Sequence, residues 1–489
     1  MTLATTALAV TIMTATIFTL LGLRQSSRQT ITLEDYMVSR NRMGTGMAIA
    51  TIVASALGAW TLFSPPQVGA TSGIAGILGY CLGQAGPSGL FATMGGRIRS
   101  LMPQGHGLNE YVLHRFGNAM YLLTLAIALF YMFIYLTAEL TAIAKAVELM
   151  AAVPLWLTSL VVMTAVFIYT LVGGLGAAIF TDALQFVVIA PLLPLSFAIA
   201  LVALGGWEKA IAPVMQAAPE LLSLTNGPGL RFGATLVIAV IAAEMFNQVN
   251  WQRVYACRSD RVVQQSFLGS FILIWPMLII AGLLGILAMH FGFNDDRAFF
   301  SLIQALALPQ WFSILVLVLV LALVMSTLGA LLNGIISLFT TDLLRLLPHR
   351  SSQDILKLTR ILTLVISIPT VFLAAQGYNV LYLFLLADLV CAGALFPVLF
   401  GLYSRRLTGP MALGSALAGI ALGALFFPGP DFSGWNSLPW AGDLLVSFTA
   451  PIVVSLVLSL GQFKSRPGAA KPRFSILTAC ARALPPTTR

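Results

Sequence analysis

Charged side chains are scarce in this sequence: Asp, Glu, Lys and Arg form 9% of the 489 residues, whereas hydrophobic residues form 58%. So few polar side chains cannot cover a water-soluble globule of this length, which excludes that class. Cysteine and histidine are also scarce, with four of each and no spacing typical of a metal site or a disulfide framework. No nucleophile-base pair and no phosphate-cradling loop is evident, so an enzyme is the least favoured class.

Long hydrophobic runs, in contrast, recur along the whole chain. A bilayer-spanning helix needs about 20 mainly apolar residues at a rise of about 1.5 Å each. The sequence therefore predicts an all-α polytopic membrane protein with thirteen transmembrane helices. The expected spans are 3–23, 45–72, 73–95, 118–146, 153–172, 176–204, 231–252, 262–292, 311–344, 359–377, 380–403, 408–428 and 442–462.

The basic residues predict how these helices are oriented, because Lys and Arg are retained in cytoplasmic loops. Of the 26 Lys and Arg residues, 22 fall on one side, and the other side holds only Lys145, Lys209, Arg231 and Arg297. We therefore expect the N-terminus outside and the C-terminus in the cytoplasm, in a membrane that is most simply a bacterial inner membrane. The net charge of +9 then reflects topology and contact with anionic lipids, and no nucleic-acid partner is expected.

The number of spans suggests an internal organisation. When each half of a repeat has an odd number of spans, the two halves have opposite orientations in the membrane. The predicted parts are an N-terminal helix and cytoplasmic loop at 1–44, a first five-helix repeat at 45–204, an external loop at 205–230, a second five-helix repeat at 231–404, two C-terminal helices at 405–462, and a disordered basic cytoplasmic tail at 463–489.

The first helix of each candidate half is interrupted in an unusual way. The span at 45–72 carries Gly58 and then Ser64-Pro65-Pro66, where two backbone donors are missing and a helix kinks or unwinds. The span at 231–252 ends in a polar run at 246–253, although it has no Pro or Gly at the expected break. Interrupted helices at matching positions mark the binding site in inverted-repeat transporters.

Four carboxylates lie within predicted spans, where each one costs at least about 2.5 kcal/mol to insert. They are Glu139, Asp182, Glu244 and Asp388. A buried structural hydrogen bond is the alternative to a functional role for each. We expect Asp182 near the cytoplasmic headgroups, where it serves either an ion exit path or the cap of a helix end.

Two adjacent hydroxyls, Ser326 and Thr327, follow the very hydrophobic run at 311–325. Such hydroxyls often bond back to a carbonyl of their own helix, which requires no function. A small hard cation prefers oxygen ligands, however, and an unwound facing helix supplies free carbonyls. The pair is therefore a candidate sodium site. Trp60 and Tyr135 are candidates for a solute cavity, with ordinary packing as the alternative.

Residues 33 to 405 resemble the sodium:solute symporter family, whose members include sodium-coupled sugar, proline, pantothenate and urea transporters. The matching motifs are Leu33-Glu34-Asp35-Tyr36 with Arg40, Glu110-Tyr111 with Arg115-Phe116, 169–175 leading to Thr181-Asp182-Ala183-Leu184-Gln185, Asn247-Gln248 with Gln252-Arg253, and Met325-Ser326-Thr327-Leu328 leading to Thr341-Asp342-Leu343. The resemblance implies a LeuT-like inverted-repeat core of ten helices, with one extra helix before it and two after it.

The resemblance also implies site residues. The sodium ligands would be the carbonyls of Ala54, Leu57 and Leu323 with the hydroxyls of Ser326 and Thr327, and Asp182 would lie on the exit path of the ion. The substrate-binding residues would be Trp60, Tyr135, Glu139, Asn247, Gln248 and Asp388.

Two departures from the family pattern qualify this transfer. Ala56 stands where some relatives place an Asp, so neutral oxygens alone are expected around the ion. Glu244-Met245 stands where proline transporters carry aromatic residues, so proline is not favoured.

The function predicted from these features is a sodium-coupled symporter that imports a small polar organic solute that is urea-, amino-acid- or sugar-like. A proton-coupled or facilitative transporter of the same fold, with Glu139 or Glu244 as the protonatable group, is one alternative. A membrane solute sensor is another, although no output domain supports it. The substrate, the number of ions and the oligomeric state stay open.

Overall fold

The computed structural model describes residues 3–26, 32–404, 406–430, 432 and 442–461, and every regular element in this part of the chain is a helix. The predicted tail at 463–489 lies outside the described residues. The α-helices are α1 (Leu3–Ser26), α2 (Leu33–Met37), α3 (Thr45–Ala56), α4 (Ser64–Leu101), α5 (Leu108–Phe116), α6 (Asn118–Ala151), α7 (Leu155–Ala203), α8 (Trp207–Ala217), α9 (Gly227–Glu244), α10 (Gln248–Ala256), α11 (Asp260–Ala288), α12 (Ala298–Ala305), α13 (Gln310–Leu346), α14 (Ser352–Ala374), α15 (Val380–Tyr403), α16 (Gly409–Phe426) and α17 (Leu444–Gly461). The short 3-10 helices are η1 (Ala59–Leu62), η2 (Pro219–Leu222) and η3 (Met289–Phe291).

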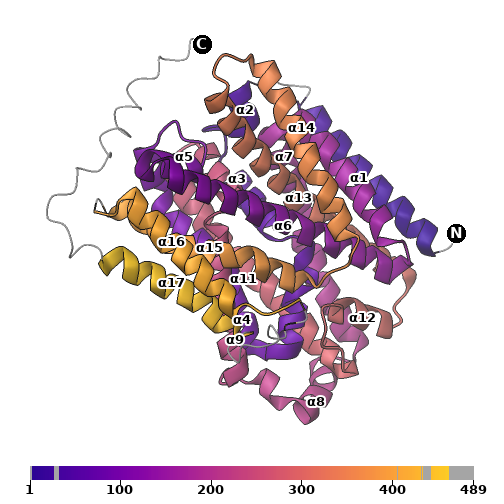
Figure 1. The fold of residues 1–489 in the computed structure, drawn as a ribbon. Helices are drawn as coiled ribbons and strands as arrows, with labels where there is room; N and C mark the ends of the chain where they lie inside the picture. The colour runs from indigo at the N-terminus through magenta and orange to yellow at the C-terminus, as the bar shows by residue number, and fades with distance from the viewer. Residues whose placement is uncertain (1–2, 27–31, 405, 431, 433–441, 462–489) are drawn as a thin grey trace.

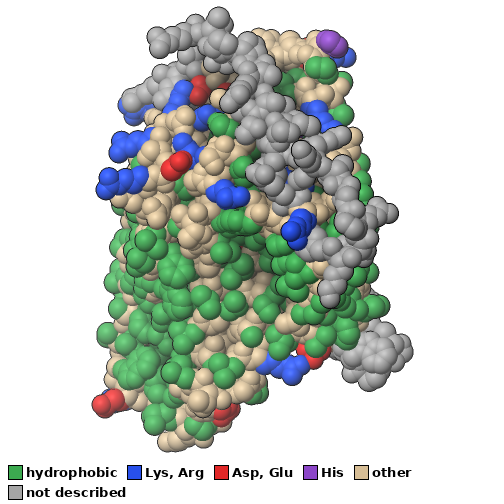
Figure 2. Space-filling model, turned by 90° about the vertical axis from the view of Figure 1, so that its left-hand side faces the viewer, with side chains coloured by type: hydrophobic (Ala, Val, Ile, Leu, Met, Phe, Trp, Pro, Cys, Tyr) green, Lys and Arg blue, Asp and Glu red, His purple; other side chains and the backbone are tan. Residues whose placement is uncertain are grey.

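The outer surface has the character of a membrane protein. In the described part of the chain, nine helices are long and apolar enough to cross a membrane. Figure 2 shows a belt of hydrophobic side chains around the middle of one face, with charged side chains gathered towards its two ends. Val187, Ile368 and Phe372 each expose more than half of their surface, which suits contact with lipid.

Two glycines divide long helices where the sequence predicted a boundary between spans. The 49-residue α7 bends at Gly174 (φ 57°), between the predicted spans 153–172 and 176–204. In α4 the bend is at Gly73 (φ 66°), between 45–72 and 73–95. A Cβ at Gly73 would lie 2.1 Å from the carbonyl oxygen of Leu221, so only glycine fits this bend. The total of thirteen spans stays a prediction.

Helix α13 forms the centre of the molecule. In its most apolar window 83% of the residues are buried, against 28% for the neighbouring α14. It packs against α3, α6, α7 and η1. On one side of the bundle α1 packs against α7 and α13, and on the other side α16 and α17 pack against each other and α15 (Figure 1).

Two helices are interrupted inside the bundle, at the places that the sequence indicated. Helix α3 ends at Ala56, the backbone is extended at Leu57 and Gly58, and the helical path resumes through η1 into α4. The second interruption lies between α9 and α10, where Met245 and Phe246 form a turn before Asn247 caps α10. The first break confirms the expectation from Gly58 and the Pro pair. The second break occurs without a Gly or a Pro at the turn.

Candidate ion and solute sites

The break between α3 and η1 frees backbone groups inside the protein. Leu57 donates to the carbonyl of Val53 at 3.0 Å, and its extended conformation then ends the helical hydrogen-bond pattern. The Nε2 of Gln84 donates to the carbonyl of Ala56 at 3.3 Å. The carboxylate of Glu139 accepts the N–H of Ala59 at 2.8 Å. Side chains from α4 and α6 therefore replace part of the hydrogen bonding that the break removes.

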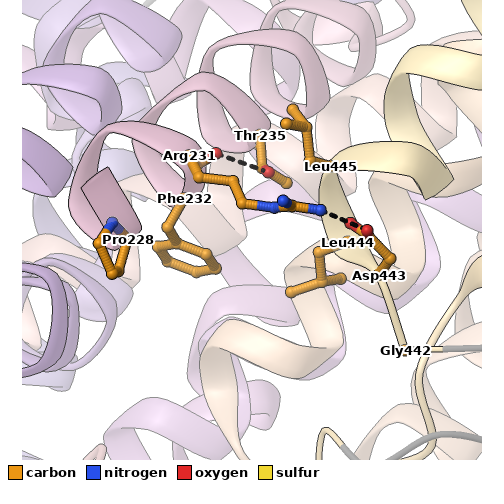
Figure 3. A pocket seen from close by; sticks show the side chains of 8 residues that line it. All are labelled: Pro228, Arg231, Phe232, Thr235, Gly442, Asp443, Leu444 and Leu445. Atoms are coloured by element: carbon orange, nitrogen blue, oxygen red, sulfur yellow. Dashed lines mark hydrogen bonds and ion pairs between the residues drawn. The ribbon is translucent and has the colours of Figure 1, made fainter.

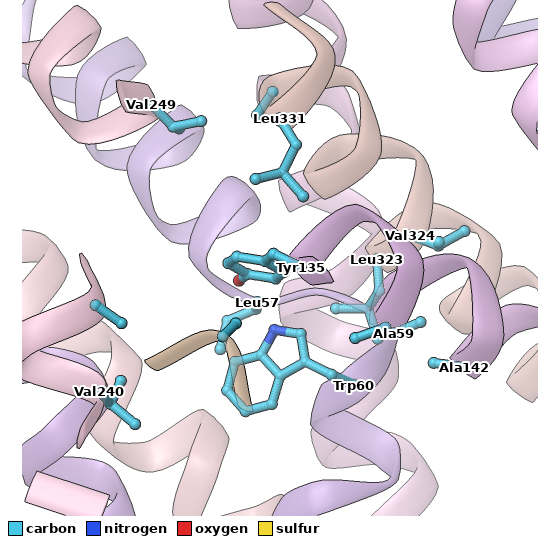
Figure 4. Close-up of a cluster of buried hydrophobic side chains, with 14 of the residues drawn as sticks. Leu57, Ala59, Trp60, Tyr135, Ala142, Val240, Val249, Leu323, Val324 and Leu331 are labelled. Carbon is cyan, nitrogen blue, oxygen red and sulfur yellow. The ribbon is translucent and has the colours of Figure 1, made fainter. Parts of the chain in front are cut away.

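Ser326 and Thr327 are buried on α13, which packs against α3 and η1. Ser326 Oγ donates to Asp182 Oδ1 at 2.8 Å, and Thr327 Oγ1 donates to the Leu323 carbonyl at 3.3 Å. Because both hydroxyl protons are already donated, the oxygen lone pairs can face a cation. Figure 4 shows Leu57 and Ala59 of the break beside Leu323 of α13, so the predicted carbonyl and hydroxyl ligands come from neighbouring segments.

Asp182 is buried inside the protein and is not an exposed helix cap. Its side chain is 1% exposed and accepts hydrogen bonds from Thr51 Oγ1 at 2.6 Å, from Ser326, and from Arg253 Nη2 at 3.0 Å. Helices α7 and α10 bring Asp182 and Arg253 together inside the protein, where their charges compensate each other. The expected position of Asp182 near the cytoplasmic headgroups stays a prediction. Neutral oxygens alone do not surround Ser326 either, since this carboxylate is hydrogen-bonded to it.

A small cavity of about 20 Å³ adjoins the first break. Residues from η1, α4, α6, α9 and α15 line it: Trp60, Tyr80, Gln84, Tyr131, Tyr135, Val240, Glu244, Phe384 and Asp388. Three of the predicted substrate residues, Trp60, Tyr135 and Asp388, meet here. Figure 4 shows the side chains of Trp60 and Tyr135 close to each other and to Leu57. A cavity of this volume holds about one water molecule, so a solute enters only after side chains move.

The other predicted substrate residues lie elsewhere. Glu139 is fully buried against the break, where its carboxylate accepts the backbone N–H of Ala59. Asn247 caps α10 by accepting the Val249 N–H at 3.1 Å. Gln248 lines a separate cavity of about 320 Å³, and its Nε2 donates to the carbonyl of His106 at 2.8 Å. The structure thus does not bring Gln248 to the small cavity.

Sequence reasoning missed several lining residues, although a signal for them existed. Four helices each present two residues to the cavity at a spacing of four, which places both on one helix face. The pairs are Tyr80 with Gln84, Tyr131 with Tyr135, Val240 with Glu244, and Phe384 with Asp388. Two of the three predicted residues therefore pointed to a partner one turn earlier: Tyr135 to Tyr131, and Asp388 to Phe384.

The two carboxylates of the cavity have different surroundings. Glu244 accepts hydrogen bonds from Tyr131 Oη at 2.9 Å, Asn247 Nδ2 at 3.0 Å and Asn250 Nδ2 at 2.9 Å, all of which are neutral donors. Asp388 is 3% exposed, and in the described part of the chain neither a hydrogen-bond donor nor a basic side chain pairs with it. Two acidic groups therefore face one cavity without a basic partner of their own.

A wider cavity of about 440 Å³ lies between α9 and α17 (Figure 3). Its two ionic groups, Arg231 and Asp443, pair with each other, and Thr235 Oγ1 donates to the Arg231 carbonyl at 3.1 Å. The charges that line this cavity are compensated within the protein. We therefore place the candidate solute site at the smaller cavity beside the break.

A family model described as the sodium:solute symporter family matches residues 36–419. The chain belongs to this family. This symporter-family member is 27% identical over 420 residues to the spermidine transporter DUR31 of Candida albicans, a match that covers 83% of this chain and 78% of the relative. It is 26% identical over 493 residues to the sodium/proline symporter of Escherichia coli, which covers 94% of each.

The fold is also that of known transporters. A solved substrate-bound, outward-open structure of a Na⁺-coupled sialic acid symporter aligns with a TM-score of 0.76 over 95% of this chain and 98% of that one. At 17% identity this likeness shows the fold alone. The predicted LeuT-like fold is confirmed, and the relatives are transporters rather than enzymes, as the sequence indicated. The predicted domain boundaries stay predictions.

Proposed function

We propose that this family member imports a small organic solute together with sodium by alternating access, with the ion held between the break and α13. The observation that carries the proposal is the position of Ser326 and Thr327 on a buried helix that packs against the α3–η1 break. The ligands would be the carbonyls of Ala54, Leu57 and Leu323 together with the two hydroxyls. Sodium enters this scheme as a transported ion.

The geometry suggests how ion and solute affinities become coupled. An ion bound between the break and α13 stabilises one arrangement of the extended backbone at Leu57 and Gly58. Trp60, two residues further along, lines the solute cavity. An ion that orders the break therefore orders one wall of the cavity, and the bound solute raises the sodium affinity by the same factor. Asp182, hydrogen-bonded to Ser326, is placed to receive the ion on its exit path.

The relatives leave the charge of the solute open. Two of them are named for spermidine, which is a polyamine, and for proline, which is an amino acid. The predicted urea-, amino-acid- or sugar-like class includes the amino acid but not the polyamine. We further propose a bacterial inner membrane with the N-terminus outside, on the distribution of Lys and Arg.

Sodium binding can be tested before the solute is known. A ligand that binds only the folded state stabilises it by about 2.7 kcal/mol at 100 times its dissociation constant. We expect sodium, compared with potassium, to raise the unfolding temperature of the purified full-length protein. The double variant Ser326→Ala with Thr327→Ala should lose this response. A matched control is Thr363→Ala, a buried hydroxyl of α14 that bonds only to its own helix, to the Thr359 carbonyl at 2.8 Å. A double variant that keeps the full sodium response contradicts the site.

Proton coupling is a second candidate, and one observation favours it. Glu139 Oε1 is buried and has no hydrogen-bond partner within the described part of the chain, so no donor stabilises a negative charge on it and a proton would lower the cost of its burial. In this case uptake into proteoliposomes would follow a pH gradient in the absence of sodium. The variant Glu139→Gln would abolish that uptake, and Ser326→Ala with Thr327→Ala would leave it unchanged.

A further inference from the structure

The ionic groups of the interior fall into two kinds. Asp182 pairs with Arg253, and Lys145 pairs with Asp296, so each of these buried charges has its counter-ion inside the protein. Glu139, Glu244 and Asp388 differ, because in the part of the chain that the structure describes none of them forms an ion pair with a basic side chain. Of these three, Glu244 and Asp388 line the small cavity. A buried charge without a partner is costly, and proteins retain such charges mainly where a ligand completes them.

The hydrogen bonds around Glu244 suit a carboxylate rather than a carboxylic acid. Its two oxygens accept from one tyrosine hydroxyl and two side-chain amides, and these bonds stabilise negative charge without neutralising it. Asp388 adds a second acidic group on the cavity wall, and nothing in the described chain is bonded to it. An anionic solute would be repelled here, and a neutral polyol would leave both acidic groups without a counter-charge.

Aromatic rings form most of the remaining wall. The Trp60 ring stacks on Tyr80 with centroids 5.5 Å apart and meets Phe384 edge-on at 5.7 Å. Phe384 also meets Tyr135 at 4.8 Å. The negative faces of such rings attract organic cations, and an aromatic cage with a nearby carboxylate is a recurring way to bind an ammonium group. The cage and the two acidic groups thus favour the same kind of ligand.

We propose that the transported solute is an organic cation, an aliphatic amine or ammonium compound, whose charge is neutralised by Glu244 and Asp388 within the ring cage. This inference deepens the proposed function and rests on it for the location of the solute site. It departs from the urea-, amino-acid- or sugar-like solutes that the sequence predicted, and stays within the broader class of small organic solutes. The cavity of about 20 Å³ is then the closed form of a site that opens as the rings move.

The test compares solutes that differ in charge and little else. The purified full-length protein, reconstituted in liposomes, is offered 1,4-diaminobutane, choline and the uncharged 1,4-butanediol, together with proline and glucose, in sodium and in potassium. We expect saturable binding of at least one amine or ammonium compound and none of the diol. Asp388→Asn should weaken cation binding at least about thirtyfold, since removal of one partner from a buried charge pair typically costs this much.

Control variants separate this charge effect from unfolding. Glu148→Gln removes a charge from α6 outside the cavity and should leave cation binding unchanged. Asp388→Glu keeps the charge and should retain more affinity than Asp388→Asn, a difference that a merely structural role would not produce. Sodium-dependent binding of proline or glucose, with no cation bound, overturns the inference and leaves sodium coupling intact. Cation binding that is equal in sodium and potassium supports the inference and contradicts the coupling.

Discussion

Two buried acidic regions lie on either side of the same helix break, and they differ in how their charge is balanced. Beside α13, Asp182 has a permanent counter-ion in Arg253 and further donors in Thr51 and Ser326. Around the small cavity, the described residues offer Glu244 only neutral donors and offer Asp388 none. The first region can maintain its structure without a ligand. The second is electrostatically incomplete, as expected of a site that a transported solute completes in each cycle.

The largest expected effect comes from breaking the balanced region. Arg253→Ala leaves the fully buried Asp182 without its ion-pair partner, and such a loss typically lowers the free energy of unfolding by about 3–5 kcal/mol. Thermal unfolding of the purified protein in detergent measures it as a lower apparent unfolding temperature. Adding Asp182→Asn to the same chain should restore most of the stability. Equal unfolding temperatures for the single and double variants would show that the ion pair is not the cause.

A smaller loss should follow from filling the break itself. A Cβ at Gly58 would lie 2.0 Å from Glu139 Oε1, so Gly58→Ala must displace the carboxylate that accepts the Ala59 N–H. Overpacking of this kind costs about 1–3 kcal/mol. The matched control is Gly46→Ala in helix α3, which precedes the break; there nothing lies within 4 Å of the added Cβ and alanine favours the helix. The two variants should shift the unfolding temperature in opposite directions, and a common direction would be inconsistent with the proposed clash.

Much of this arrangement could be predicted from the sequence. Hydrophobic length predicted the helices, and the Pro pair after Gly58 predicted the first break, because both signals are local. The second break contains no Gly or Pro. Its polar run at 246–253 was recognisable only as unusual for a membrane span. There the turn is supported by side-chain bonds, including Asn250 to Glu244, which join residues on either side of the break.

It was harder to predict which polar side chains are buried inside the protein, and against which partners, than to predict the helices. Arg253 belongs to a segment that reads as a basic loop, and only the fold shows that Asp182, 71 positions away, neutralises it inside the protein. Gln248 adjoins Asn247 in sequence, but the first turn of α10 directs it to the other cavity. The burial and the partners of such side chains depend on contacts between residues far apart in the sequence, and a single sequence does not reveal these contacts.

A third variant tests the region around the small cavity, where the acidic groups have no basic partner among the described residues. Asp388→Asn replaces a buried acidic side chain that has no partner among the described residues with a neutral amide, so the solute-free protein should become more stable, by about 1 kcal/mol. The balanced region should respond in the opposite sense, since Asp182→Asn leaves Arg253 unpaired. Both are measured by thermal unfolding without added solute. Destabilisation by both variants would show that Asp388 already has a favourable environment in the protein.

The smallest effect concerns ionic contacts outside the membrane spans. His106 Nε2 donates to Glu34 at 2.7 Å and Nδ1 donates to Glu110 at 3.0 Å, which ties α2 to α5 near the cavity of Gln248. Burial alone would lower the pKa of His106, but the two carboxylates outweigh it and raise this pKa to about 9. Burial would likewise raise the pKa of Glu34, yet His106 and Arg40 lower it to about 2.

The sign of the pH effect follows from these shifts. The contribution of His106 is complete below its ordinary pKa of 6.5 and is lost as the pH rises through about 9. The contribution of Glu34 is present above 4.5 and is lost as the pH falls through about 2. Because the Glu34 side chain is 40% exposed, water screens the pair, and we expect a local effect below about 1 kcal/mol. Hydrogen exchange in α2 and α5, corrected for the intrinsic rate, should show easier opening above pH 9 than below 6.5. His106→Gln should remove this difference, and a wild-type protein with the same opening free energy at both pH values would exclude a stabilising role for the charged histidine.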